Sequence, residues 1–268
     1  MKKITFIGAG NMAQSLIAGL IKDETSLSIS VADPLAEQLE VINTAWPNVI
    51  THGDNLQAIK DADAVILAVK PQLMQQVCEP LQDTVQQRQP LVISIAAGIT
   101  EANLSTWLGG DLPVVRCMPN TPALVQAGMT GLYANELVSE NQRSLAESIL
   151  RSVGATIWFD DEDKLNAVTA VSGSGPAYFF LVMEAMQYAA KNLGLSSEDA
   201  KQLVLQTAFG AAKLALESPD DAAELRRKVT SKGGTTEAAL KKLSEGGLIE
   251  LFDTALSAAS DRSKELSK

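Results

Sequence analysis

The sequence predicts an α/β fold with an N-terminal Rossmann domain, built on a doubly wound and mainly parallel sheet, followed by an all-α domain. Two observations predict this class. Up to residue 161, short runs rich in Val and Ile alternate with segments of helical period, as in repeated strand–helix units. From residue 162 onward no strand pattern occurs, and Ala, Leu, Glu and Lys recur at helical spacing. We therefore expect domains at 1–161 and 162–268.

The strands expected in the first domain are short and bounded by turn residues. Two of them, 63–69 and 91–96, are apolar on both faces, as in a sheet that helices cover on each side. The expected strands are 3–8, 27–32, 48–51, 63–69, 91–96, 112–116, 129–134 and 155–159. The expected helices between them are 11–23, 34–45, 54–60, 72–86, 100–108 and 139–152.

The second domain carries stripes of small residues that allow helices to approach one another closely. Residues 208–212 and 255–259 are examples, and both are rich in alanine. A helical domain of about a hundred residues often completes its core with a second subunit. We therefore favour a homodimer through this domain, with a monomeric bundle as the alternative.

Composition and charge exclude several classes of function. The 268 residues carry 22 basic and 32 acidic side chains, and the net charge of −10 offers no basic face to nucleic acid. No apolar stretch approaches the roughly 20 residues of a membrane span, and no signal peptide is recognised. Two cysteines and one histidine provide neither a disulfide framework nor a metal site. We expect a cytoplasmic protein with no metal, membrane or nucleic-acid partner.

The stretch Gly8-Ala9-Gly10-Asn11-Met12-Ala13 lies where a strand ends and a helix begins, as a dinucleotide fingerprint requires. Gly8 permits the tight turn, and Gly10 allows the backbone to approach a pyrophosphate. Asp33, at the end of the second strand, is placed to accept hydrogen bonds from an adenosine ribose. It is equally placed to cap the following helix, and one residue can do both.

Asp33 also bears on the choice of cofactor. A carboxylate at this position repels the 2′-phosphate of NADPH, and no Lys or Arg between Lys22 and Lys60 offsets it. NADH should therefore at least be accepted.

Three further stretches stand at the carboxyl ends of strands, where open α/β sheets bind their ligands. They are Ala68-Val69-Lys70-Pro71, Ala96-Ala97-Gly98 and Arg116-Cys117-Met118-Pro119-Asn120-Thr121-Pro122. Lys70 and Arg116 can equally be solvated loop charges. Asn120, between two prolines, is the residue that we place against a nicotinamide.

Two motifs mark the second domain. In Ser172-Gly173-Ser174-Gly175-Pro176-Ala177-Tyr178, Ser174 or Gly175 is a natural N-cap and Pro176 suits a first helical turn. In Val229-Thr230-Ser231-Lys232-Gly233-Gly234-Thr235-Thr236-Glu237, two glycines precede hydroxyl residues at a helix start. Such a loop is a helix cap or a cup for a carboxylate, and we favour the cup.

In these motifs the sequence resembles the pyrroline-5-carboxylate reductases, which make L-proline from its cyclic imine precursor. The resemblance extends over essentially the whole chain. It implies a Rossmann domain and a helical domain that interlocks with a partner in a homodimer, which often assembles further into a decamer. The implied cofactor is NADPH or NADH. Many relatives carry a small polar or basic residue where Asp33 stands, which puts a strict NADPH preference in doubt.

The resemblance also assigns residues to the site. Together with Asp33, the expected cofactor contacts are Ile7, Gly8, Gly10, Asn11, Met12, Asn55, Ala68, Val69, Lys70, Pro71 and Asn120. The expected substrate contacts are Ser231, Gly233, Gly234, Thr235, Thr236 and Glu217.

The residue types suit reduction of a C=N bond in a small-molecule substrate. A substrate that arrives as an iminium needs little from a protein acid, so a site without histidine is sufficient. As a hypothesis, Thr236 is the catalytic residue and hydrogen-bonds the imine nitrogen or product amine. Ser231 and the amides of Gly234 and Thr235 fix the carboxylate.

Two other functions compete with this interpretation. A β-hydroxyacid dehydrogenase has a similar plan but uses a lysine four residues after the glycine motif, where this chain has Phe179. A non-catalytic dimer that senses NAD(P)H would explain the Rossmann half, but it leaves the hydroxyl-rich loop at 229–237 without a purpose.

Overall fold

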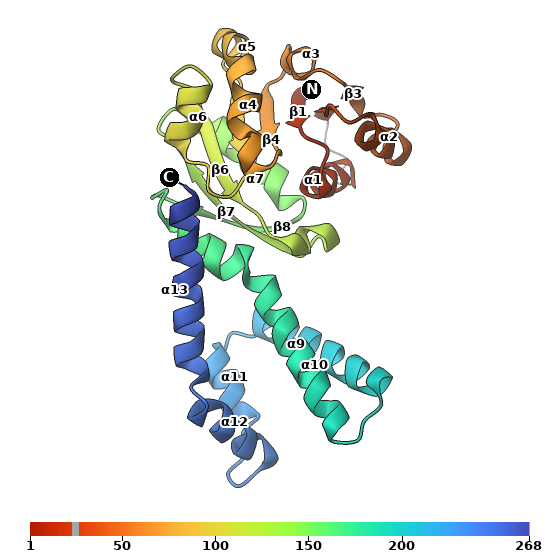
Figure 1. The fold of residues 1–268 in the computed structure, drawn as a ribbon, viewed down its shortest axis with the longest axis vertical. Coiled ribbons are helices and arrows are strands. Elements are labelled where there is room, and N and C mark those ends of the chain that lie inside the picture. Colours follow the sequence, from red (N-terminus) through yellow and green to blue (C-terminus); the bar gives the residue numbers. More distant parts are fainter. Residues whose placement is uncertain (23–26, 268) are drawn as a thin grey trace. The chain divides into compact units, whose positions relative to one another are not determined.

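The computed structural model describes residues 1–22 and 27–267, and it confirms the predicted α/β plus all-α class. The last residue of the helix expected over 11–23 and the last residue of the domain expected over 162–268 lie outside the described residues. The chain forms two compact units (Figure 1). The first unit comprises residues 1–174 and the segment that begins at Ala258, and the second comprises Gly175–Ser257.

The first unit contains one sheet whose strands follow the order β3-β2-β1-β4-β5-β6-β7-β8. Neighbouring strands are parallel except for β6 and β7, which are antiparallel. The strands are β1 Lys2–Ile7, β2 Leu27–Ala32, β3 Ile50–His52, β4 Ala64–Leu67, β5 Leu91–Ser94, β6 Val114–Met118, β7 Gly128–Ala134 and β8 Gly154–Phe159. The order reverses between β1 and β4, which is where sheets of this kind bind their ligands.

Helices cover both faces of this sheet, as the doubly apolar strands predict. Ile4 and Phe6 of β1 belong to a core shared with α1 (Asn11–Lys22), α2 (Ala36–Ala45) and α7 (Glu140–Arg151). The alternate residue Ile7 belongs to the core of the opposite face. That core is shared with α3 (Asn55–Ile59), α4 (Met74–Cys78), α5 (Gln82–Arg88) and α6 (Glu101–Trp107).

The single helix expected over 72–86 is wrong, because the segment is broken into short pieces. A 3-10 turn (Pro71–Leu73) precedes α4, and a second one (Glu79–Leu81) separates α4 from α5. The second turn contains Pro80, which has no N–H for the helical hydrogen bond and whose ring disfavours a regular helix.

The rest of the chain is helical, as expected. The elements are α8 (Lys164–Val168), a π-helical turn (Thr169–Gly173), α9 (Gly175–Asn192), α10 (Ser197–Glu217), α11 (Ala222–Lys228), α12 (Thr235–Glu245) and α13 (Leu248–Leu266). In the second unit α9 packs along α10 (Figure 1). The compact units divide at 174/175, whereas the expected boundary at 161/162 followed the end of the strand pattern. The difference arises because α8 packs against β6 and β7.

The N-cap expected at Ser174 or Gly175 is wrong, because one helix runs from Lys164 to Asn192. Ser174 has helical dihedrals (φ −84°, ψ −20°), and its N–H donates to the Thr169 carbonyl at 2.8 Å. The helix therefore continues through the π-helical turn into α9. Among the described residues this run, Lys164–Asn192, is the one helix long and apolar enough to span a membrane, with a mean hydropathy of 1.2 in its most apolar window. No stretch of this length and apolarity is expected from the sequence analysis. Helices that pack against other parts of a protein can have the same composition, so this helix is weak evidence for a membrane span.

Candidate active site

The turn between β1 and α1 is built around two glycines with different physical requirements. Gly8 has φ +102°, and a Cβ there would lie 2.6 Å from the Ala68 carbonyl oxygen. Only glycine fits this position, because both the dihedral and the close approach of β4 exclude a side chain. A Cβ on Gly10 would meet no described atom within 4 Å. The protein's own packing therefore does not require glycine at position 10, whereas close approach of a pyrophosphate would.

Asp33 joins the end of β2 to this turn. Its Oδ2 accepts the Ala9 N–H at 2.9 Å, and its Oδ1 accepts the Leu35 N–H at 2.9 Å. The first bond fixes the glycine turn, and the second closes the short turn that leads into α2. Each carboxylate oxygen keeps a further lone pair. The expected helix cap is wrong, because the N-cap of α2 is Leu35 and no side chain caps this helix. The capacity of Asp33 to accept a ribose hydroxyl is retained.

The other expected cofactor residues stand along the same edge of the sheet. The Ala68 N–H donates to the Ile7 carbonyl at 2.8 Å, which places the start of the 68–71 stretch directly beside the glycine turn. Lys70 is exposed, and Pro71 begins a 3-10 turn. Asn55 is the first residue of α3, which Asp54 caps. Asn11 and Met12 form the first turn of α1.

Asn120 follows β6, and its side-chain amide is engaged within the protein. Its Oδ1 accepts the Met129 N–H at 2.8 Å. Its Nδ2 lies 3.2 Å from both the carbonyl oxygen and the Oγ of Ser172. No sequence motif marks Ser172 as a partner of Asn120, and the one signal is Pro176, which has no N–H to donate to the Ser172 carbonyl.

Arg116 is not a solvated loop charge. Its side chain is 10% exposed, and it forms an ion pair with Glu162, with 2.6 Å between NH1 and Oε1. The same Glu162 oxygen accepts the Glu101 N–H at 2.6 Å. Burial, and then the charges of Glu162 and Glu101, raise the pKa of the adjacent Tyr133. This network joins β6, α6 and the segment just before α8, so it stabilises the packing of these three parts.

The hydroxyl-rich loop of the second unit ends at α12. Its two glycine amides are used internally: the Gly233 N–H donates to Glu237 Oε2 at 2.7 Å, and the Gly234 N–H donates to the Ser231 carbonyl at 3.0 Å. Gly233 has φ +74°, a conformation that favours glycine. Glu237, to which the sequence analysis gave no role, therefore locks the loop.

Three hydroxyls and two amides at this helix start remain available. Among the described residues, none hydrogen-bonds the hydroxyl of Ser231, Thr235 or Thr236, and none accepts the amides of Thr235 and Thr236. Unpaired amides in the first turn of a helix suit an anion. The carboxylate cup thus fits Thr235 and Thr236 better than Gly234, whose amide already has an acceptor.

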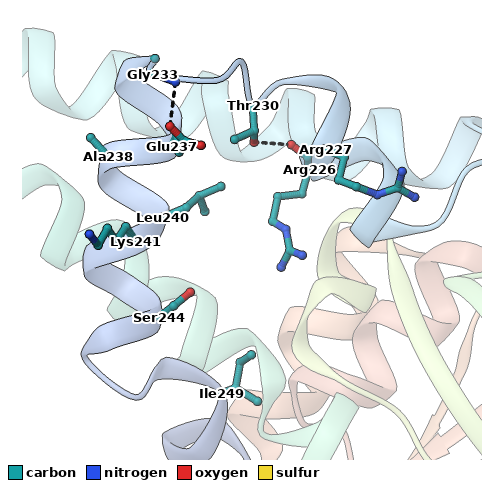
Figure 2. Close-up of a pocket in the computed structure, with 11 residues that line it drawn as sticks. Arg226, Arg227, Thr230, Gly233, Glu237, Ala238, Leu240, Lys241, Ser244 and Ile249 are labelled. Atoms are coloured by element: carbon teal, nitrogen blue, oxygen red, sulfur yellow. Dashed lines mark hydrogen bonds between the residues drawn. The ribbon is translucent and has the colours of Figure 1, made fainter.

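Figure 2 shows an open groove of about 1090 Å³ between α11 and α12. Gly233 and Gly234 line it, together with Arg226, Arg227 and Lys241. Ser231, Thr235 and Thr236 are not among the described residues that line the groove. Glu217, the last residue of α10, pairs with Lys213 at 3.8 Å. No hydrogen bond or ion pair joins Glu217 to the loop within the described part of the chain.

Comparison with known proteins follows the same two-part division. The model of the pyrroline-5-carboxylate reductase dimerisation family matches residues 162–266. The model of the coenzyme F420-dependent NADP oxidoreductase family matches residues 3–98. The chain is 52% identical to a pyrroline-5-carboxylate reductase of Pseudomonas aeruginosa over 99% of this chain and 97% of the relative. It is 45% identical to that of Haemophilus influenzae over the same shares.

Solved structures give the same relationship. A pyrroline-5-carboxylate reductase from Coxiella burnetii superposes with a TM-score of 0.94 at 49% identity, over 99% of this chain and 98% of the other. A pyrroline carboxylate reductase from Plasmodium falciparum, solved with NADP bound, has a TM-score of 0.87 at 27% identity, over 100% and 98% of the two chains.

Proposed function

The chain belongs to the pyrroline-5-carboxylate reductase family, and we propose that it reduces 1-pyrroline-5-carboxylate to L-proline, the final step of proline biosynthesis, with NAD(P)H as reductant. The observation that carries the substrate assignment is the start of α12, where Ser231, Thr235 and Thr236 present hydroxyls without partners among the described residues. Family membership and Phe179 in place of a lysine both weigh against a β-hydroxyacid dehydrogenase.

The residues that would hold the cofactor belong to the edge of the sheet. Gly8 and Gly10 give the pyrophosphate a close approach to the backbone, since no described residue fills the space beside Gly10. Asp33 braces this turn through Ala9 and keeps lone pairs for ribose hydroxyls. When bound, the nicotinamide supplies the hydride for the imine carbon.

The residues of the α12 start bind the substrate. The amides of Thr235 and Thr236 and the Ser231 hydroxyl hold the carboxylate, because the first turn of a helix favours a negative charge. The Thr236 hydroxyl hydrogen-bonds the ring nitrogen, and thereby sets the orientation of the imine carbon. The Gly233–Glu237 bond keeps this loop in shape before the substrate arrives.

Asp33 makes NADH an accepted cofactor. Its carboxylate is held by two N–H groups, and no basic residue between Lys22 and Lys60 is available to bind a 2′-phosphate. Glu37 in the first turn of α2 and Asp54 before α3 add further negative charge to this end of the domain. The NADP reported for the Plasmodium relative describes that protein, which is 27% identical to this chain.

The helical unit supports a homodimer. Phe179, Phe180 and Leu181 of α9 are each more than 60% exposed, as is Phe209 of α10. Large apolar side chains exposed to water on both helices indicate a protein partner. The matched dimerisation family supplies the partner, a second copy of this chain. We further propose that these dimers assemble into a decamer. We also propose that the protein is cytoplasmic.

The test is the loss of reduced-cofactor absorbance with pyrroline-5-carboxylate, measured in parallel for NADH and NADPH. Imine-dependent oxidation establishes the reductase, and omitting the imine is the control. Cofactor binding without turnover of either nucleotide would overturn the proposal in favour of a nucleotide sensor.

A further inference from the structure

Two asparagines close the two ends of the same antiparallel ladder. The β6–β7 register runs from Val115–Ala134 to Met118–Gly131. Continued in both directions, it sets Asn120 opposite Met129 and Asn135 opposite Val114. Each asparagine accepts the N–H of the residue opposite through Oδ1, at 2.8 Å for Asn120 and 3.1 Å for Asn135.

Each of these asparagines also donates both hydrogens of its Nδ2 to partners within the protein. Asn135 donates to the Leu112 carbonyl at 2.9 Å and to Glu101 Oε1 at 3.0 Å. Asn120 donates to the carbonyl oxygen and the hydroxyl of Ser172, each at 3.2 Å. The two residues are thus matched in type, partial burial and number of bonds. They differ in place, because Asn120 stands at the carboxyl end of β6, on the edge where such sheets bind ligands, and Asn135 stands at the opposite end.

The partner of Asn120 is a carbonyl that has lost its usual α-helical donor. The helical donor to the Ser172 carbonyl would be the N–H of residue 176, which is a proline and has none. Ser172 lies in the π-helical turn Thr169–Gly173, a distortion that is frequent at functional sites. In the same turn, a Cβ on Gly173 would lie 2.4 Å from Met118 Cε. Met118 therefore packs against this turn, and Asn120 hydrogen-bonds it.

The orientation of the Asn120 amide is fixed by these partners. Exchanging its oxygen and nitrogen would set two donors together at Met129 and two acceptors together at Ser172. The amide has no hydrogen left for a nicotinamide. The group that can contact the cofactor here is therefore the backbone of the loop after β6, which the Asn120 side chain holds in place.

We propose that Asn120 is a positioning residue, which fastens the loop after β6 to Met129 and to the carbonyl of Ser172, and so holds the loop backbone in the arrangement that receives the nicotinamide. This rests on the proposed function for the identity of the cofactor. The π-helical turn and Pro176 contribute to this positioning, because the turn contains the Ser172 carbonyl that accepts from Asn120 and Pro176 does not compete for it.

The experiment compares Asn120→Ala with Asn135→Ala. Each substitution removes three hydrogen bonds, so both should lower the thermal midpoint by a similar amount, on the order of 5 °C. Only Asn120→Ala should raise the Kd for NADH, followed by nucleotide fluorescence, and lower kcat/KM for the imine, each by about tenfold or more. Because NADH binding needs no turnover, this readout holds even if pyrroline-5-carboxylate is not the substrate.

Ser172→Ala separates positioning from direct contact. It removes the hydroxyl and keeps the carbonyl, so it should produce part of the Asn120→Ala effect and add little to it in the double variant. Equal Kd changes in Asn120→Ala and Asn135→Ala would overturn the proposal, as would a Ser172→Ala variant that leaves the Kd for NADH unchanged. In the first case Asn120 serves stability alone, and in the second it contacts the cofactor itself.

Discussion

Asp33 Oδ2 accepts a hydrogen bond from the Ala9 N–H at 2.9 Å, which ties the end of β2 to the glycine turn after β1. A residue that sequence patterns associate with the ribose is therefore also a brace for the pyrophosphate turn. Its second oxygen is held by Leu35, so the carboxylate is fixed in place and its charge remains at the adenosine end of the expected site.

Replacing Asp33 with Asn should shift the cofactor preference toward NADPH. The substitution removes the charge that repels a 2′-phosphate, so the ratio of kcat/KM for NADPH to that for NADH should rise by about tenfold or more. It should also cost about 1–3 kcal/mol of unfolding free energy, because an NH₂ group now faces one of two N–H donors.

Glu37→Gln is the matched control, since it removes one negative charge from the exposed first turn of α2 without touching the glycine turn. Its cofactor ratio should stay near that of the unaltered protein. An equal shift in both variants would mean that net charge, and not the position of Asp33, sets the preference.

The two glycines of the turn should respond in opposite ways to alanine. Gly10→Ala should leave the thermal midpoint nearly unchanged, because its Cβ would meet none of the atoms that the structure describes. It should nevertheless weaken NADH binding at least about tenfold. Gly8→Ala should destabilise the fold, because its Cβ would meet the Ala68 carbonyl at 2.6 Å. Differential scanning calorimetry and NADH titration measure the two effects. Unchanged NADH affinity in Gly10→Ala would place the cofactor away from this turn.

Removing the Thr236 hydroxyl should slow the reaction without affecting cofactor binding. We expect Thr236→Ala to lower kcat about 100-fold, because a hydrogen bond to the reacting nitrogen is lost, with the Kd for NADH unchanged. Thr236→Ser should recover most of the rate. Thr254→Ala is the control, since that hydroxyl bonds only the Glu250 carbonyl of its own helix among the described residues. An unimpaired kcat in Thr236→Ala would refute the role given to this residue.

Both cysteines should resist thiol reagents in the folded protein. Burial, with a smaller effect from Glu79, raises the pKa of Cys78 to about 12. Burial also raises the pKa of Cys117, although the charge of Arg116 opposes it. Labelling near pH 8 should therefore modify neither thiol until the chain is unfolded in urea. Rapid labelling of the folded protein would contradict this burial.

The same shifts make stability fall at alkaline pH. An unfolded thiol ionises above about pH 8.5, whereas the folded thiols stay protonated, so the unfolded state binds fewer protons. The free energy of unfolding should then decrease above this pH by up to about 1.4 kcal/mol per pH unit for each thiol. Urea titrations from about pH 8 to 9.5 measure the slope. It should be smaller in Cys78→Ala, and an equal slope there would assign the loss to other groups.

Local patterns were sufficient wherever a short segment decides its own conformation. The doubly apolar strands β4 and β5 are apolar because helices cover both faces, and this is visible in the residues themselves. The helix expected over 72–86 is broken for a local reason too, because Pro80 cannot donate the helical hydrogen bond and is visible in the sequence. The spacing of Gly233 and Glu237 was also readable, since a glutamate four residues on can reach back to an amide at a helix start.

Long-range partners were beyond such patterns. Ser174 has the features of an N-cap, yet the helix passes through it. The Ser172 carbonyl, which cannot accept an N–H from Pro176, accepts one from Asn120 in another part of the chain. The sequence alone determined the alternation that makes the Rossmann sheet, the glycine turn at its edge and the helical second half, because each depends on residues close together in the chain. Only the tertiary structure decided which of the expected polar groups are already bonded, since a hydrogen bond between Asn120 and Ser172 depends on how β6 and the helix pack, and no local pattern records that.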